Sequence, residues 1–391
     1  MALAKAIFWG CLFLVVYTYF LYPMLLFLAY SAAQARRDLR YLFGRDNRRR
    51  SLTAPDRLPG VTLLISAYNE EKHLPDKIAN IRQLDYPADR LEVILVSDGS
   101  TDRTDEILRS LLDANVQKIF LSDRKGKANA LNHAVAAAQN EILIFSDAAT
   151  LFAPDSLKAM IRHFSNPRVG AVCGALRFEN TAESKQTEGA YWRYEGMLRL
   201  MEARLGATLT ASGAIYALRR QCFRPLPPGT VLEDFLIPMN VRKQGLRVLY
   251  DPEATATDFA APNVAGEFAR RVRLAVGSYQ AIGELLATPL PGFAMVAFVS
   301  HKLLRWIVGF LLVGLLISNA FLVGSPLYRV LLIGQLLFYA WAAFGYLFRQ
   351  RMQHSRFGLV GYFLVAMNVA FLVGFVRFLL GREEATWQRV S

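Results

Sequence analysis

The chain has 391 residues, of which 53% are hydrophobic and 20% are charged, and its mean hydropathy is +0.24. This composition is too apolar for an ordinary soluble protein of this length, so part of the chain is expected to lie in lipid. The net charge of +13 does not indicate nucleic acid, because much of the basic excess lies at the ends of apolar stretches, next to anionic headgroups. The three cysteines lack metal-type spacing, so no disulfide framework is expected.

Four apolar stretches have the length needed to cross about 30 Å of hydrocarbon. They run roughly over Ile7–Tyr30, Leu303–Val323, Leu327–Phe348 and Gly358–Leu380. The first has the position of a secretory signal peptide, but its apolar run is too long and no small-residue cleavage site precedes the arginines that follow. We therefore interpret it as an anchor, with three further spans at the C-terminal end.

Basic residues predict how these spans are oriented. Lys5 alone precedes the first span, whereas seven arginines follow it, at positions 36, 37, 40, 45, 48, 49 and 50. Since cytoplasmic flanks carry the excess of Lys and Arg, the middle of the chain is expected in the cytoplasm and both termini outside. Basic residues at 302, 305, 349, 351 and 356 agree with this orientation. We expect a multi-pass protein of the cell (inner) membrane.

The segment from about Arg36 to Pro289 is long enough for one large domain with its own core. Apolar runs of strand length occur at 61–67, 92–96, 118–121, 142–145 and 171–176, and they alternate with helical patterns near 70–83, 102–114, 127–138 and 154–164. This alternation predicts an α/β fold with a mostly parallel, Rossmann-like sheet and helices on both faces. Ligands bind at the carboxyl ends of the strands in such a sheet.

Polar residues follow the predicted strands at that edge. The first strand ends in Ala67-Tyr68-Asn69-Glu70, the second in Ser97-Asp98-Gly99-Ser100-Thr101-Asp102 and the fourth in Ser146-Asp147-Ala148-Ala149-Thr150. The third is followed by Asp123-Arg124-Lys125-Gly126-Lys127, where a glycine with three cations at a helix start suits phosphate. Each run alone is more often a turn, a helix cap or a solvated loop. Their convergence at one sheet edge favours a nucleotide site.

In their order and spacing these motifs resemble the family 2 glycosyltransferases of the GT-A type, which include cellulose, chitin and hyaluronan synthases and poly-N-acetylglucosamine synthase-like enzymes. The resemblance runs from about Val61 to Gly277, and it also rests on the runs Gly126–Asn132, Ala211-Ser212-Gly213 and Leu232-Glu233-Asp234. It implies an inverting transfer of a sugar from a nucleotide diphosphate, expected to be UDP, to a growing polysaccharide or oligosaccharide at the cytoplasmic membrane face.

The resemblance implies roles for individual residues. Uridine contacts fall on Ala67, Tyr68, Glu70 and Asp98, diphosphate contacts on Lys125 and Lys127, and acceptor contacts on Ser212 and Gly213. Asp234, next to Glu233, matches the general base that removes the acceptor's proton during a single in-line step. The other explanation for Glu233 and Asp234 is a pair of acids at a helix start, which the helix dipole favours.

Asp147 matches the first acid of the family's DxD motif, which positions the ribose and a metal ion. The third position of the motif is Ala149, so the carboxylate that usually contacts the ion is missing. Asp147, Thr150 and water still offer an oxygen shell for Mg²⁺ or Mn²⁺. We therefore expect a divalent metal cofactor despite the substitution.

An amphipathic segment precedes the C-terminal spans. Apolar residues from Phe268 to Leu286 recur at helical spacing with three arginines among them, which predicts a helix in the membrane interface. The family's QxxRW motif has its best match in 270–274, so Arg273 is expected to hold the leaving diphosphate. The run Lys302-Leu303-Leu304-Arg305-Trp306 keeps the Arg-Trp pair, but we interpret it as an interfacial anchor.

The sequence thus predicts four parts: an anchor at 1–35, a cytoplasmic GT-A domain at 36–265, interfacial amphipathic helices at 266–300 and three spans at 301–391. The expected partners are a nucleotide-sugar donor, a glycan or lipid-linked acceptor, the bilayer and export or regulatory subunits. One alternative is the non-processive transfer of a single sugar to a lipid-linked acceptor. Another is an inactive receptor or a transporter, but the spans lack the paired acids that pumps need.

Overall fold

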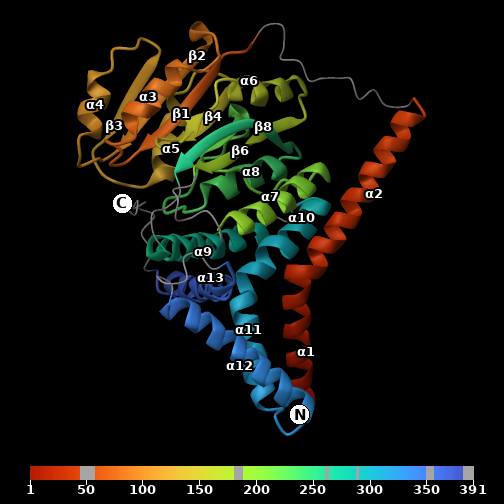
Figure 1. Cartoon of the computed structure of the whole chain (residues 1–391). Coiled ribbons are helices and arrows are strands. Elements are labelled where there is room, and N and C mark those ends of the chain that lie inside the picture. The colour runs from red at the N-terminus through yellow and green to blue at the C-terminus, as the bar shows by residue number, and fades with distance from the viewer. Residues whose placement is uncertain (45–57, 180–187, 260–263, 288–289, 349–355, 382–391) are drawn as a thin grey trace.

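The computed structural model describes residues 1–44, 58–179, 188–259, 264–287, 290–348 and 356–381. An α/β domain lies above a set of long helices, and the N-terminal helix rises from the far tip of that set to the side of the domain (Figure 1). The predicted basic positions 45–50, 349 and 351 and the boundary residue Pro289 lie outside the described residues.

One eight-stranded sheet forms the centre of the domain, in the order β3-β2-β1-β4-β7-β6-β8-β5. The strands β3, β2, β1 and β4 are parallel, β7 is antiparallel to both neighbours, and β6 and β8 are parallel. The bounds are β1 Val61–Ala67, β2 Leu91–Asp98, β3 Val116–Leu121, β4 Ile142–Asp147, β5 Leu151–Phe152, β6 Val169–Glu179, β7 Ile215–Arg219 and β8 Arg247–Phe259. All five predicted strands are present, and the mostly parallel sheet is confirmed.

Helices cover both faces of this sheet, because β1, β2 and β4 are apolar on both faces and must be buried on both. Helices α3, α4 and α6 share one hydrophobic cluster with the sheet, and α5 and α8 share the other. The bounds are α3 Leu74–Arg82, α4 Thr104–Ser110, α5 Lys127–Ala137, α6 Ser156–Ile161, α7 Glu188–Arg204 and α8 Glu233–Lys243, with short 3₁₀ turns at Ala88–Arg90, Arg162–Ser165 and Arg220–Cys222.

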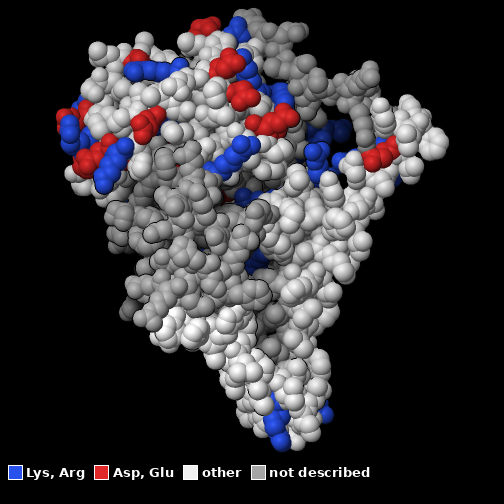
Figure 2. Space-filling view, in the orientation of Figure 1, with Lys and Arg blue, Asp and Glu red and all other residues white. Residues whose placement is uncertain are grey.

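Four helices in the described part of the chain are long and apolar enough to cross a membrane: 2–42, 293–320, 326–347 and 361–379. They comprise α1 Ala2–Val16, a π-helical turn Tyr17–Leu21, α2 Tyr22–Leu42, α10 Phe293–Ala297, a second π-helical turn Phe298–Leu303, α11 Leu304–Ala320, α12 Pro326–Leu347 and α13 Arg356–Leu379. Charged side chains gather on the α/β domain and on the upper end of α2, whereas the visible described surface of these helices between that end and the far tip is almost uncharged (Figure 2). The predicted arrangement of one leading and three trailing spans is confirmed.

Helix α9, Val264–Ala287, lies between the domain and the membrane helices (Figure 1). Its apolar face packs on α13, where a Cβ at Gly374 would lie 2.5 Å from the Cβ of Ala275. The hydroxyl of Tyr279 donates a hydrogen bond to the carbonyl of Trp306 in α11 at 3.0 Å. The helix therefore holds the domain on the membrane helices.

Candidate active site

The loops after β1 and β2 are bound to each other at the carboxyl edge of the sheet. Asn69 has a positive φ of 54°, a left-handed conformation that asparagine tolerates better than most residues. Its side-chain oxygen accepts a hydrogen bond from the Thr101 amide at 2.8 Å, and its side-chain NH₂ donates to the Thr101 hydroxyl at 3.1 Å. The backbone amide of Glu70 donates to Thr104 at 2.8 Å, and Glu70 itself is buried. The first two motifs thus form one rigid edge.

Asp98, the last residue of β2, is 4% exposed and holds the basic loop after β3. Its two carboxylate oxygens accept hydrogen bonds from the backbone amides of Lys125 at 3.0 Å and Gly126 at 2.7 Å. A Cβ at Gly99 would lie 2.7 Å from the amide nitrogen of Arg124, so only glycine allows this close approach. Asp98 therefore shapes the basic loop through the backbone of the loop.

Arg124 stacks its guanidinium on the ring of Tyr68, 3.7 Å from the ring centre. This cation–π contact joins the basic loop to the residue that follows β1. The flat pair lies where the resemblance places the nucleotide base. The side chain of Lys125, in contrast, is exposed.

Lys127 connects the donor motif to the acids of α8. Its ammonium lies 2.6 Å from Oδ1 of Asp147 and 2.8 Å from Oε1 of Glu233. Burial lowers the pKa of Lys127, but the two carboxylates outweigh burial and raise the pKa above its usual value. Lys127 therefore remains charged and brings the end of β4 and the start of α8 together.

Asp234, next to Glu233, is a carboxylic acid in an unfavourable place for a charge. Burial, followed by the nearby charge of Glu233, raises the pKa of Asp234 to about 6, while Lys127 and Arg199 act in the opposite direction. A carboxylate with a pKa just below neutrality is still ionised at pH 7 and is a stronger base than an exposed one. Asp234 therefore has the properties of a general base.

Ser212 and Gly213 lie directly against these acids. A Cβ at Gly213 would lie 3.2 Å from the Cβ of Asp234 and 3.4 Å from Nζ of Lys127, which leaves no room for a larger residue without a shift. The backbone amide of Ala211 donates to the carbonyl of Asp234 at 3.0 Å. The structure thus brings the predicted acceptor residues and the predicted base together.

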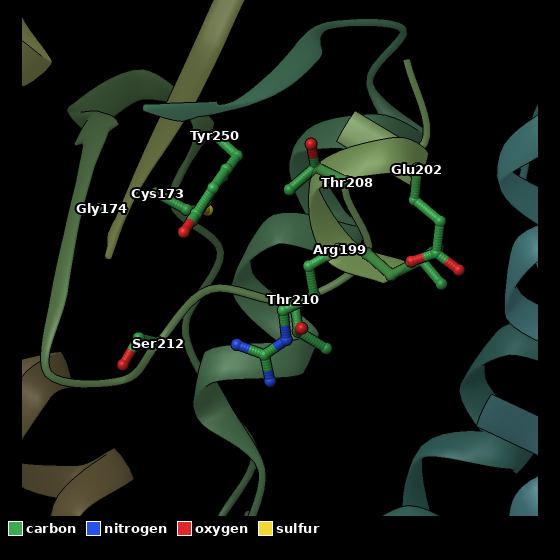
Figure 3. A pocket seen from close by; sticks show the side chains of 9 residues that line it. Cys173, Gly174, Arg199, Glu202, Thr208, Thr210, Ser212 and Tyr250 are labelled. Atoms are coloured by element: carbon green, nitrogen blue, oxygen red, sulfur yellow. The ribbon is translucent and has the colours of Figure 1, made fainter. Parts of the chain in front are cut away.

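A small cavity of about 10 Å³, enough for roughly one water molecule, opens beside Ser212. Arg199 of α7 points its guanidinium towards the Thr210 side of this cavity, and Cys173 and Tyr250 come from the sheet (Figure 3). Arg199 was not expected from the sequence. Its positive charge is one of the two that oppose the raised pKa of Asp234.

The other side of α7 is bound to the membrane helices by a buried ionic cluster. Glu195 accepts hydrogen bonds from Lys302 at 2.9 Å and Arg305 at 2.7 Å, and it lies 3.0 Å from the His301 ring. Glu202 accepts from the hydroxyl of Tyr22 at 2.7 Å and lies 2.8 Å from the other ring nitrogen of His301. The two π-helical turns meet here, since the hydroxyl groups of residues 17 and 300 are 2.9 Å apart.

This cluster corrects the interpretation of Lys302, Arg305 and Trp306 as an interfacial anchor. The side chains of Lys302 and Arg305 are each 13% exposed and reach the domain rather than the membrane surface. The Trp306 ring packs against Phe235, the residue after the predicted base, at a centroid distance of 5.9 Å. The anchor interpretation is wrong because Glu195, distant in sequence, supplies a buried counter-charge.

Arg273 lies on the side of α9 that faces the base. Gly277, one turn further along the same face, is so close to the segment before α8 that a Cβ there would lie 2.7 Å from Cγ of Leu232. Arg273 is partly buried. Its predicted role at the leaving group stays a prediction.

The residues around Asp147 fit a divalent metal only in part. The Asp147 side chain is 29% exposed, and metal sites of this class need one or two carboxylates together with substrate phosphates. Thr150 is fully buried, and its hydroxyl has no hydrogen-bond partner within the described residues. However, the ammonium of Lys77 donates to the Thr150 carbonyl at 2.5 Å, and this positive charge opposes a cation there. The ammonium of Lys127, 2.6 Å from Oδ1 of Asp147, opposes a cation at Asp147 in the same way. A metal held by Asp147 and Thr150 therefore stays a prediction.

Residues 62–225 match the family described as Glycosyl transferase family 2. They are a family 2 glycosyltransferase domain. The matched range contains the strands β1 to β7 and every donor residue predicted from the motifs, whereas Glu233, Asp234 and Arg273 follow it. The resemblance found in the sequence is thereby confirmed.

Relatives and a solved structure extend this result. The poly-beta-1,6-N-acetyl-D-glucosamine synthase of Staphylococcus aureus (strain COL) is 28% identical to the chain over 235 residues, which cover 58% of the chain. The synthase of the same name from Staphylococcus epidermidis (strain ATCC 35984) is 27% identical over 230 residues, which cover 57%. These matches span 56% and 55% of the relatives' own lengths. A mannosyltransferase from Pyrobaculum calidifontis, solved with GDP-Man and Mn²⁺, has a TM-score of 0.68 at 22% identity, covering 92% of this chain and 99% of that one. This similarity confirms the GT-A fold.

Some residues of the site were not predicted from the sequence. Arg199 belongs to a helix that was not predicted, and Tyr216 lies in a short strand that was not predicted either. Lys77, which is buried, lies on the inner side of α3 and binds Ser146 at 2.7 Å. Burial lowers the pKa of Lys77 to about 7, against the raising effect of Asp147 and Asp258. A lysine in an amphipathic helix is ordinarily exposed, so the sequence pattern does not predict that Lys77 is buried.

Proposed function

We propose that the protein is an inverting glycosyltransferase that moves a sugar from a nucleoside diphosphate sugar, with UDP as the expected nucleotide, to a growing polysaccharide or oligosaccharide at the cytoplasmic face of the membrane. One observation carries the proposal: a half-buried carboxylate with a raised pKa, Asp234, lies beside the Lys127 bridge to Asp147 at the carboxyl edge of a GT-A sheet. The donor and acceptor groups needed for transfer meet at that point.

The donor is expected along the edge made by β1, β2 and the basic loop. The stacked pair of Tyr68 and Arg124 offers a flat surface for the base. Asp98 holds the backbone of the loop, and the loop's backbone amides and the exposed Lys125 would bind the diphosphate. Mg²⁺ or Mn²⁺ bound at Asp147 would neutralise charge on the departing diphosphate.

The reaction is a single displacement. Asp234 accepts the proton of an acceptor hydroxyl, whose oxygen then forms a bond to the anomeric carbon while the bond from that carbon to the diphosphate breaks. Attack from the side opposite the leaving group inverts the anomeric centre. Arg273 would stabilise the negative charge of the leaving group as a nearby cation. Ser212 and Gly213 border the acceptor side of the base.

A second candidate is the transfer of one sugar to a lipid-linked acceptor. The observation that favours it is the short path from the base to the membrane helices, since Phe235 packs directly on Trp306 of α11. A lipid-linked acceptor in the bilayer would then lie close to Asp234. Both candidates share the donor chemistry, and they differ in the length of the product.

The test is a screen of nucleoside diphosphate sugars with the full chain in lipid nanodiscs, measuring hydrolysis, transfer and product length. The active donor should give a ladder of products, whereas a single product would favour the second candidate. Asp234→Asn should bind the donor normally and lose about 10²–10⁴-fold in transfer. Asp113→Asn, at an exposed ion pair far from the motifs, is the matched control and should keep its activity. If Asp234→Asn keeps more than about a tenth of the activity, Asp234 is not the base.

A further inference from the structure

Tyr216 lies in β7, which is placed in the sheet between β6 and β4, the strand that ends in the predicted donor residue Asp147. Its neighbours in register are Phe145 of β4 and Cys173 of β6. The ring stacks on Phe145 with a centroid distance of 4.4 Å and an interplanar angle of 3°, and the residue is 1% exposed. The stack fixes the ring, so the direction of the hydroxyl is fixed as well.

The hydroxyl of Tyr216 has no hydrogen-bond partner among the described residues. A buried hydroxyl without a partner is unfavourable, and a phenylalanine would give the same stack without that cost. Burial, followed by Glu233, Asp234, Asp147 and Cys173, raises the pKa of Tyr216 well above its usual value, so the hydroxyl keeps its proton. Tyr216 is therefore a permanent hydrogen-bond donor next to a group of acids.

Asp234 is the matching group. Glu233 and Asp147 are both paired with Lys127, whereas the Asp234 carboxylate forms no hydrogen bond or ion pair within the described chain. The chain that leads into β7 packs against Asp234, because the amide of Ala211 donates to its carbonyl and a Cβ at Gly213 would lie 3.2 Å from its Cβ. The Tyr216 hydroxyl, which lacks a hydrogen-bond acceptor, and the Asp234 carboxylate, which lacks a donor, thus lie in the same small region.

We propose that Tyr216 is a positioning residue for the base: its hydroxyl donates a hydrogen bond to the Asp234 carboxylate when substrates fill the site, and this bond orients the carboxylate towards the acceptor hydroxyl. The inference rests on the proposed function, in which Asp234 is the base. The hydrogen bond favours the ionised carboxylate, as do Lys127 and Arg199, against the opposing effects of burial, Glu233 and Asp147.

The test is Tyr216→Phe in the full chain, with the melting temperature and the pH profile of kcat as readouts. Loss of the unpaired hydroxyl should raise the melting temperature by about 1–4 °C. The same change should lower kcat by about 10- to 100-fold and move the acid limb of the kcat profile, which reports the substrate-bound enzyme, to higher pH, because the ionised carboxylate loses a donor. A residue that only fills the core would show the gain in stability without the kinetic change.

Tyr86→Phe is the matched control, because the hydroxyl of Tyr86 has a partner, the carbonyl of Pro59 at 2.6 Å, and lies away from the acids. It should lower the melting temperature and leave kcat and the pH profile unchanged. Activity of Tyr216→Phe within twofold of the wild type, with an unshifted profile, would overturn the inference while Asp234→Asn remains inactive. If Asp234→Asn stays active, the proposed base itself fails, and the two failures are thereby distinguished.

Discussion

At the scale of residues, the site is a small set of charges that control one another. Three carboxylates, those of Asp147, Glu233 and Asp234, share two cations, Lys127 and Arg199. Lys127 is fully engaged with the first two acids, so Asp234 is the acid whose charge is least compensated. The raised pKa of Asp234 follows from this division of charge as well as from burial.

The first prediction concerns pH. Because the base works only when ionised, kcat/KM should rise with pH and level off above an apparent pKa near 6. Glu233→Gln removes a negative neighbour and should move the acid limb to lower pH, whereas Arg199→Gln removes a positive one and should move it to higher pH, each by about half to one unit. Profiles of kcat/KM measure both shifts, and shifts in the same direction would contradict the electrostatic account.

The second prediction concerns Ala149, which is buried next to Asp147. We expect a chelator to abolish transfer, because lysine ammonium groups neutralise a leaving diphosphate less completely than a bridging ion. Ala149→Asp should lower the Mn²⁺ concentration needed for half-maximal rate, and Ala149→Asn, equal in size, should do so less. Titration of activity with Mn²⁺ after chelation gives both values. Full activity in excess chelator with metal-free enzyme would remove the metal from the reaction.

At the scale of elements, helix α7 joins the membrane helices to the site. One side of it carries Glu195 and Glu202 into the buried ionic cluster, and Arg199 reaches the cavity beside Ser212. Burial raises the pKa of Glu195, but Lys302, His301 and Arg305 outweigh burial and hold the pKa well below its usual range. Glu195 is therefore ionised and is the main counter-charge for two buried cations.

The third prediction follows from that cluster. Glu195→Gln keeps the shape of the side chain but leaves Lys302 and Arg305 buried without their counter-charge, so the free energy of unfolding should fall by about 3–5 kcal/mol. Arg82→Gln, which breaks the exposed pair with Asp113, is the control and should change it by less than about 1 kcal/mol. Thermal unfolding in detergent compares the two variants. Equal melting temperatures would mean that the cluster contributes little.

At the scale of the whole molecule, the α/β domain and the membrane helices form a continuous structure. Helix α9 lies between them and contacts both, and Trp306 of α11 packs against Phe235 of the domain. These contacts place Asp234, the residue before Phe235, close to the apolar helices. Acceptors that approach along the membrane would therefore pass close to Asp234.

The fourth prediction concerns the orientation of the four membrane helices. The excess of arginine after the first span predicts that the domain lies in the cytoplasm, where nucleotide sugars are made. A reporter that is active only outside the cytoplasm should be silent when fused after Arg50 and active when fused after Ser391. Two further fusions extend the map. A fusion before the first span should be active, and one after Leu347 should be silent. An active fusion after Arg50 would contradict the proposed location of the site.

The sequence by itself determined the elements that depend on local patterns. The strands that end at Ala67, Asp98 and Asp147 are continuous apolar runs, so they were predicted at nearly their observed positions. The four membrane helices follow from length and apolarity alone. The motif residues were also placed at one sheet edge, because parallel strands bring their carboxyl ends together.

Only the tertiary structure decided which charges are paired. Lys127 was expected at the diphosphate but bridges Asp147 and Glu233, which lies 106 positions later in the numbering. Glu195 binds Lys302 of the second π-helical turn and Arg305 of α11, both more than 100 positions away. Strand β8 has an uneven pattern interrupted by Pro252, so its place in the sheet depends on β6 rather than on its own periodicity. Local periodicity carries information about burial of a segment but none about its distant partner. The chemistry of a buried charge depends on that partner, and the packing of the folded chain selects it.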